Sequence, residues 1–204
     1  VMTAHAKTRQ RSLAPWFHLI YERKTIMNKI VLLTGAPASG KTTLARMLAE
    51  HSPKSIHIQV DQVREMMVSG IHLPGRGGWS DEATRQFQWG RTTASFMANL
   101  YASNGVDAFI DDVCVPQFFS DQYAELFKNP AVLRVLLIPS EDALIERLKR
   151  RAGPHDAHMA AAIPVIYRYL EPMPKDGWIV LDSSEWSIEQ TFQEVLRTTG
   201  GDMP

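Results

Sequence analysis

The sequence predicts an α/β fold in which helices cover both faces of one five-stranded parallel sheet, a three-layer α/β/α arrangement. Two observations support this class. From Lys29 onward, five short apolar runs alternate with segments of helical pattern, the order that a parallel sheet with crossover helices requires. A glycine-bounded turn at residues 35–42 also separates the first apolar run from an amphipathic helix. We therefore expect one α/β domain over residues 27–204.

The strands are predicted from the apolar runs. Residues 29–34, KIVLLT, form a continuous apolar run, which is typical of a central parallel strand covered on both faces. Four further strands are predicted at 55–60, 107–113, 131–139 and 177–182.

The helices are predicted from periodicity and from start and stop signals. Leu44, Met47 and Leu48 are spaced i, i+3, i+4 and place one apolar face on the helix after the turn. A long helix begins at Ser80 or Asp81 and ends near residues 104–105. Further helices are predicted at 61–68, 120–127, 140–152, the stretch up to 170, and 184–198, with a glycine-rich loop at 70–78.

Composition limits the classes of function. The 204 residues carry 22 basic and 22 acidic side chains, and this balance disfavours long nucleic acid held by the overall charge of the protein. Cys114 is the single cysteine, which excludes an intramolecular disulfide and fits a reducing cytoplasm. No apolar run approaches the roughly 20 residues of a membrane span. Residues 1–26 are interpreted as a peripheral N-terminal extension.

The turn carries a phosphate-binding motif, G-x-x-x-x-G-K-[ST]. Its glycines let backbone N–H groups point at phosphate oxygens, and the N-terminus of the next helix adds its positive end. Lys41 is expected to reach the β- and γ-phosphates, and the Thr42 hydroxyl is expected to ligate Mg²⁺. The expected ATP-binding residues of this loop are Gly35, Ala36, Pro37, Ala38, Ser39, Gly40, Lys41, Thr42 and Thr43.

An acceptor site is predicted after the second strand. Asp61 follows this strand directly, so its carboxylate should lie at the carboxyl edge of the sheet, where open α/β sheets bind ligands. A carboxylate there can accept a proton from an acceptor hydroxyl, and Arg64, one helical turn later, can hold an anionic or polar substrate group. The alternative is a helix-capping aspartate with a surface arginine.

The Ala-Pro-Ala core of the loop, the Asp61-x-x-Arg64 pair and the short chain resemble the P-loop small-molecule kinases. This branch includes shikimate kinase, gluconate kinase and chloramphenicol phosphotransferase. By the order of elements, the resemblance covers roughly residues 28–199. It implies the P-loop nucleoside-triphosphate hydrolase fold, ATP and Mg²⁺ as cofactors, and a small-molecule hydroxyl acceptor. The sequence departs from shikimate kinase after the third strand, where VCVPQF replaces a glycine-rich segment.

Two acids, Asp111 and Asp112, close the third strand. A carboxylate at this position can hold the water shell of a metal or orient a nucleophile. An acidic pair ending this strand is also similar to chloramphenicol phosphotransferase. Neighbouring side chains on a strand point to opposite faces, and the sequence leaves open which acid faces the nucleotide. Both are metal-ligand candidates, and Asp112 is also a substrate-binding candidate.

The resemblance also implies a lid at about residues 152–162. In such kinases, arginines of the preceding helix and the lid cover the nucleotide and neutralise charge on the transferred group. Arg147 and Arg151 are candidates for this role, and they share a helix face as an i, i+4 pair. The alternative is a solvated basic helix end that complements the helix dipole.

Two further side chains complete the candidate site. Arg168, in the helix after the lid, is expected to reach back to the phosphates. Trp89, in the long helix, is expected to offer flat apolar surface to the acceptor, although an aromatic residue in a helix is more often part of the core.

The leading prediction is an ATP-dependent, Mg²⁺-assisted transfer of the γ-phosphoryl group to a hydroxyl of a small molecule, with Lys41, Asp61, Arg147 and Arg151 as catalytic residues. An alternative acceptor is the 5′-hydroxyl of a nucleoside or polynucleotide. A different class, a non-catalytic nucleotide-binding switch, is disfavoured because the chain lacks the Asn-Lys-x-Asp segment with which guanine-nucleotide switches read the base.

Overall fold

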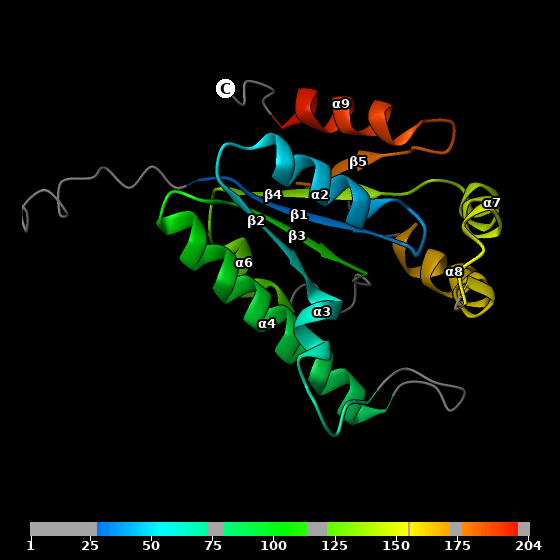
Figure 1. The fold of residues 1–204 in the computed structure, drawn as a ribbon, viewed down its shortest axis with the longest axis horizontal. Helices are drawn as coiled ribbons and strands as arrows, with labels where there is room; N and C mark the ends of the chain where they lie inside the picture. The colour runs from blue at the N-terminus through cyan, green and yellow to red at the C-terminus, as the bar shows by residue number, and fades with distance from the viewer. Residues whose placement is uncertain (1–27, 73–79, 114–121, 155, 172–176, 200–204) are drawn as a thin grey trace, which may run out of the picture.

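The computed structural model describes residues 28–72, 80–113, 122–154, 156–171 and 177–199. They form a three-layer α/β/α structure around one sheet (Figure 1). The predicted N-terminal extension (1–26), residues 73–78 of the predicted glycine-rich loop (70–78) and Cys114 lie outside the described residues. None of the described helices combines the length and the apolar run that crossing a membrane requires.

The five predicted strands form one parallel sheet. Their bounds are β1 (Ile30–Gly35), β2 (Ser55–Gln59), β3 (Asp107–Asp112), β4 (Val132–Leu137) and β5 (Ile179–Leu181). The strand order is β2-β3-β1-β4-β5, and every pairing is parallel. All six residues of β1 are buried, since β1 lies between β3 and β4 in the middle of the sheet. The prediction of a central, doubly covered first strand is confirmed.

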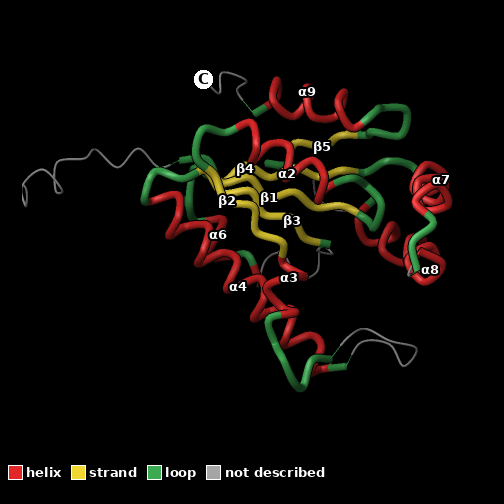
Figure 2. Tube along the Cα trace, in the orientation of Figure 1, coloured by secondary structure: helices red, strands yellow, loops and turns green. Residues whose placement is uncertain are grey.

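Helices cover both faces of this sheet (Figure 2). They are α2 (Lys41–His51), α3 (Val60–Glu65), α4 (Asp81–Ser103), α6 (Ala124–Phe127), α7 (Glu141–Arg151), α8 (Asp156–Leu170) and α9 (Ile188–Thr198). α2 and α9 pack on one face, against side chains such as Leu33 and Phe109. On the other face, α4 approaches closely because it presents the small side chains of Ala94, Ala98 and Ala102.

The last helix begins later than the sequence predicted, at Ile188 instead of Ser184. Asp182 draws Ser184 into a local turn by accepting a hydrogen bond from its backbone N at 2.9 Å. The helix is started instead by a capping box, in which Ser187 Oγ accepts from Gln190 N and Gln190 Oε1 accepts from Ser187 N. Ser184 and Ser187 are both of a residue type that caps helices, so the sequence alone did not show which of them precedes the helix.

The carboxyl ends of all five strands lie at one edge of the sheet, because the strands are parallel. There β1 leads into the glycine-bounded loop, β2 runs directly into α3, and β3 ends at its two acids. The fold therefore brings together segments that are distant in the sequence.

Candidate active site

The phosphate loop runs from the last residue of β1 to the N-cap of α2. A Cβ added at Gly35 would lie 2.5 Å from the carbonyl oxygen of Leu137 and 2.7 Å from Ser39 Oγ. Gly40 has φ 91°, a left-handed conformation that residues with a side chain rarely adopt. Both positions therefore require glycine, one because of space and the other because of its backbone angle.

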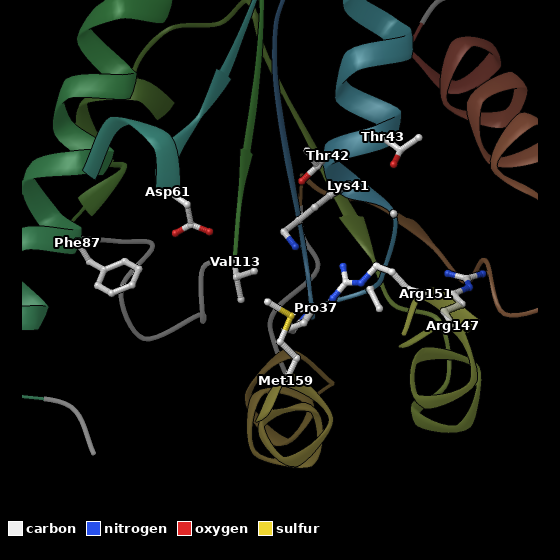
Figure 3. A pocket seen from close by; sticks show the side chains of 12 residues that line it. Pro37, Lys41, Thr42, Thr43, Asp61, Phe87, Val113, Arg147, Arg151 and Met159 are labelled. Atoms are coloured by element: carbon white, nitrogen blue, oxygen red, sulfur yellow. Dashed lines mark hydrogen bonds between the residues drawn. The ribbon is translucent and has the colours of Figure 1, made fainter. Parts of the chain in front are cut away.

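A cavity of about 490 Å³ opens in front of this loop (Figure 3). Asp61 lies on the opposite side from Arg147 and Arg151, with Lys41 between them (Figure 3). The structure thus brings together the four residues that the sequence predicted as catalytic. The lining residues are Pro37, Ala38, Gly40, Lys41, Thr42, Thr43, Asp61, Phe87, Val113, Arg147, Arg151 and Met159.

Lys41 is the first residue of α2, and its side chain points into the cavity (Figure 3). The residue is only 9% exposed. Burial lowers the pKa of Lys41, while the charges of Asp111 and Asp61 oppose this effect. A poorly hydrated cation that faces a cavity is suited to an anionic ligand, which would replace its lost hydration.

Asp61 lies in the first turn of α3, directly beyond β2. Its side chain is 66% exposed, but the surrounding cavity wall partly desolvates the carboxylate. This desolvation is the main cause that raises the pKa of Asp61, and the charge of Asp112 acts in the same direction. Arg64 and Lys41 oppose the shift. The carboxylate is accessible and more basic than an ordinary aspartate, as a proton acceptor should be.

Arg64, a predicted substrate-binding residue, is buried and does not line the cavity. Its Nη1 donates to Asp61 Oδ1 at 3.3 Å, and its guanidinium carbon lies 3.3 Å from the centre of the Phe87 ring. A Cβ at Gly90 would come within 2.6 Å of Arg64 Cγ, so the glycine makes room for this buried side chain. Arg64 Nε is buried and has no hydrogen-bond partner among the described residues. Burial lowers the pKa of Arg64, and its pairing with Asp61 opposes the shift.

The two acids at the end of β3 point to opposite faces of the sheet. Asp111 lies on the α2 face, where its Oδ1 accepts a hydrogen bond from Thr42 Oγ1 at 2.9 Å. His57 Nε2, on β2, lies 2.6 Å from Asp111 Oδ2. Asp111 is therefore the acid that adjoins the phosphate loop.

Asp112 lies on the α4 face and is part of a buried network. Its Oδ2 accepts from Arg91 Nε at 2.6 Å and from the Tyr123 hydroxyl at 3.0 Å. Arg91 also donates to Gln122 Oε1 and to the Val113 carbonyl oxygen. This position differs from the prediction that Asp112 binds metal or substrate, because its carboxylate bonds to Arg91 and Tyr123 on the α4 face, opposite the face on which Thr42 contacts Asp111.

Arg147 and Arg151 both reach the cavity from α7, as the i, i+4 spacing predicted. Arg147 donates to the carbonyl oxygen of Ser183, and burial lowers its pKa. Arg151 is paired with Asp156 at the start of α8, and these hydrogen bonds raise its pKa. The predicted lid segment, 152–162, comprises the turn after α7 and the first half of α8, except for residue 155, which is not described.

Two other predicted residues do not line the cavity. Trp89 is 52% exposed, whereas Phe87, two positions earlier on α4, lines the cavity. Positions two apart on a helix differ by about 200° in direction, so both cannot face the same site. Arg168 is exposed on α8 and is also absent from the lining.

Three apolar side chains of the cavity lining were not predicted. They are Phe87, Val113 and Met159. The buried positions Ala83, Phe87 and Ala94 on α4 follow a helical period that could have identified its inner face. No comparable signal marks Met159, which enters the cavity through the packing of α8.

The residues at the loop fit a divalent cation of the magnesium type. Mg²⁺ is usually held by one or two carboxylates together with substrate phosphates and water. The Thr42 hydroxyl and the Asp111 carboxylate are oxygen donors of this kind. Ser39 Oγ, in the loop itself, is buried without a hydrogen-bond partner in the described part of the chain. No group of three or more His, Cys, Asp or Glu among the described residues could hold a metal alone.

The fold and the loop together define a P-loop α/β protein. The sheet is parallel in this strand order, and a glycine-bounded loop precedes a helix that starts with lysine. The chain belongs to the AAA_33 family, whose model, described as an AAA domain, matches residues 30–172. No curated protein matches the sequence.

Solved structures share this fold. An unliganded sugar kinase from a Janibacter species is 23% identical with a TM-score of 0.62, covering 86% of this chain and 96% of that one. A gluconokinase from Sinorhizobium meliloti is 17% identical with a TM-score of 0.59, covering 87% and 94%. A tunicamycin resistance protein from Deinococcus radiodurans is 14% identical with a TM-score of 0.60, covering 85% and 96%. These likenesses confirm the predicted kinase-type P-loop fold.

Proposed function

We propose that the protein is an ATP-dependent phosphotransferase that moves the γ-phosphoryl group to a hydroxyl of a small molecule, assisted by Mg²⁺. The observation that carries the proposal is the position of Asp61 across the cavity from the phosphate loop (Figure 3). Nucleotide binding alone has no need of an accessible carboxylate with a raised pKa at this place. Transfer to a hydroxyl does need one, because the hydroxyl must lose its proton.

In the proposed reaction, a bond forms between the acceptor oxygen and the γ-phosphorus. The bond from the γ-phosphorus to the oxygen bridging it to the β-phosphorus breaks, and ADP leaves. The proton of the acceptor hydroxyl passes to Asp61. Because phosphoryl transfer usually has a loose transition state, the protein contributes chiefly positioning and charge.

The charged side chains of the site stabilise the transferred phosphoryl group. Lys41 contacts the β- and γ-phosphates, while Arg147 and Arg151 neutralise charge that develops on the transferred group. Thr42 and Asp111 would hold the Mg²⁺ ion, and the bound ion would offset the negative charge of the phosphates. Under this proposal, residues 152–162 form the lid that excludes water from the site.

The lining near Asp61 favours a compact acceptor. Phe87 and Val113 offer apolar surface beside the carboxylate (Figure 3). Arg64 stacks on the Phe87 ring, does not line the cavity and contacts Asp61 directly, which supports a role in setting the position and pKa of that carboxylate. A small alcohol with an apolar surface next to its hydroxyl fits these walls.

The proposal is tested by a phosphoryl-acceptor screen with ATP and Mg²⁺. The panel contains sugars, aminoglycosides, chloramphenicol-like alcohols, nucleosides and RNA 5′ ends. With any accepted substrate, Asp61→Asn should lower kcat by about 10²–10⁴-fold, the usual contribution of a general base, while ATP affinity measured by calorimetry stays near that of the wild type. Asp142→Asn, the same change at an exposed site on α7, is the matched control and should leave both values unchanged.

Other outcomes separate the alternatives. Wild-type transfer rates in Asp61→Asn would show that the acceptor site is assigned wrongly. Transfer to nucleosides or RNA ends alone would replace the small-molecule proposal with a 5′-hydroxyl kinase. ATP binding that Lys41→Ala abolishes, with no transfer to any member of the panel, would favour a nucleotide-binding switch.

A further inference from the structure

His57 lies outside the cavity lining, but it contacts the acid that adjoins the phosphate loop. His57 Nε2 is 2.6 Å from Asp111 Oδ2, and the two side chains are only 12% and 8% exposed. The other carboxylate oxygen, Asp111 Oδ1, accepts from Thr42 Oγ1 at 2.9 Å. The carboxylate is thus held at both oxygens, by the edge strand on one side and by the loop helix on the other.

The fold places this histidine by strand register. In the parallel pairing of β2 with β3, His57 is opposite Phe109 and Gln59 is opposite Asp111. Residues two apart on a strand share a face, so His57, Phe109 and Asp111 all lie on the α2 face. His57 therefore reaches diagonally to Asp111 from the neighbouring strand, a distance that an imidazole can span.

The direction of the hydrogen bond follows from the chemistry of the two groups. An ionised carboxylate only accepts hydrogen bonds, so His57 Nε2 is the donor. The bond fixes the rotation of the carboxylate about its Cβ–Cγ bond. Without it, only the Thr42 hydroxyl would restrain the carboxylate against rotation.

We propose that His57 is a positioning residue that orients the Asp111 carboxylate toward the Thr42 hydroxyl and a divalent cation bound with the nucleotide. This inference rests on the Mg²⁺-dependent nucleotide binding in the proposed function, and it does not depend on the acceptor. Partners that orient a metal ligand from behind typically change metal affinity about 10–100-fold when they are removed.

The test measures ADP affinity by calorimetry, once with Mg²⁺ and once with EDTA, and takes the ratio as the metal enhancement. His57→Phe keeps a ring of similar size but cannot donate a hydrogen bond. It should lower the enhancement about 10–100-fold while the affinity in EDTA stays unchanged. His57→Gln, whose amide nitrogen can reach a position similar to that of Nε2, should restore most of the enhancement. His51→Phe, at the exposed end of α2 opposite the phosphate loop, is the control and should retain it fully.

Thermal unfolding without nucleotide is measured for each variant. An unchanged enhancement in His57→Phe overturns the inference. So does an equal loss of affinity in Mg²⁺ and in EDTA that accompanies a lowered Tm, since that pattern indicates a purely structural role. If wild-type ADP binding needs no metal, or if no nucleotide binds, the inference is also overturned. Normal metal enhancement that depends on His57, with no transfer to any acceptor, supports the inference and refutes the proposed phosphotransferase.

Discussion

At the scale of single residues, Asp61 shows how local surroundings set chemical behaviour. The carboxylate is accessible, yet the cavity wall desolvates it enough to raise its pKa. The Arg64 guanidinium beside it opposes this shift. The balance between the two determines the pH at which the proposed base becomes available.

This balance predicts a pH dependence. Protonation of Asp61 removes the base, so kcat/KM should fall as the pH drops through the pKa of its carboxyl group. Because that pKa is raised, the fall should begin above the range of an ordinary aspartate, whose pKa is 3.8. Arg64→Met should move the fall to still higher pH, because it removes a positive charge that lowers the pKa of Asp61.

The matched control is Lys128→Met, which also removes a positive charge, but from an exposed ion pair on the surface. It should leave the pH profile in place. A profile that is flat down to the ordinary aspartate range, or a shift to lower pH in Arg64→Met, would contradict the assignment of Asp61. The measurement is kcat/KM against pH for the best acceptor of the screen.

Part of the candidate active site could be predicted from the sequence. Lys41, Asp61 and the two lining arginines could be predicted because each has a local signal, either a motif or a position next to a strand or helix end. The opposite directions of Asp111 and Asp112 could also be predicted, but which one adjoins the loop depends on how β3 is oriented in the sheet. The His57 contact depends on strand order and register, for which one sequence gives no signal.

At the scale of elements, the end of α7 contains a left-handed residue that is not glycine. Ala152 is the C-cap, with φ 50° and ψ 38°, and its backbone N donates to the Leu148 carbonyl oxygen at 3.0 Å. This conformation is costly for a residue with a Cβ. The chain carries this cost at the position where the predicted lid begins.

Ala152→Gly should therefore stabilise the protein by about 0.5–1 kcal/mol, because glycine adopts this conformation without steric strain. Ala161→Gly, at an exposed position inside α8, is the opposite control. It should destabilise the protein by about 0.5–1 kcal/mol, because glycine weakens a helix interior. Urea denaturation of both variants measures the change in the free energy of unfolding. Destabilisation by Ala152→Gly would contradict the structural account of this cap.

At the scale of the whole molecule, a buried ion pair joins helix and sheet. Arg91 on α4 and Asp112 on β3 are each only 2% exposed, and Tyr123, just before α6, donates to the same carboxylate. A buried charge that loses its partner has a high energetic cost, whereas a fully hydrogen-bonded pair is tolerated. The network therefore holds α4 against the end of β3, next to the cavity.

Asp112→Asn should lower the free energy of unfolding by about 3–5 kcal/mol, because it leaves the Arg91 charge buried without its counter-charge. Glu125→Gln breaks an exposed pair, with side chains 81% and 69% exposed, and should change stability by less than about 1 kcal/mol. Both values follow from urea denaturation monitored by fluorescence. Equal effects of the two substitutions would show that the buried pair contributes no more to stability than the exposed pair.

The two sides of the cavity come from different stretches of chain. Asp61 and Phe87 belong to the stretch that contains α3 and α4, whereas Lys41, Arg147 and Arg151 belong to α2 and α7 (Figure 3). Under the proposed function, the choice of alcohol and the handling of the nucleotide can evolve independently. A chimaera that carries another kinase's α3–α4 stretch in this scaffold would exchange one preference and inherit the other.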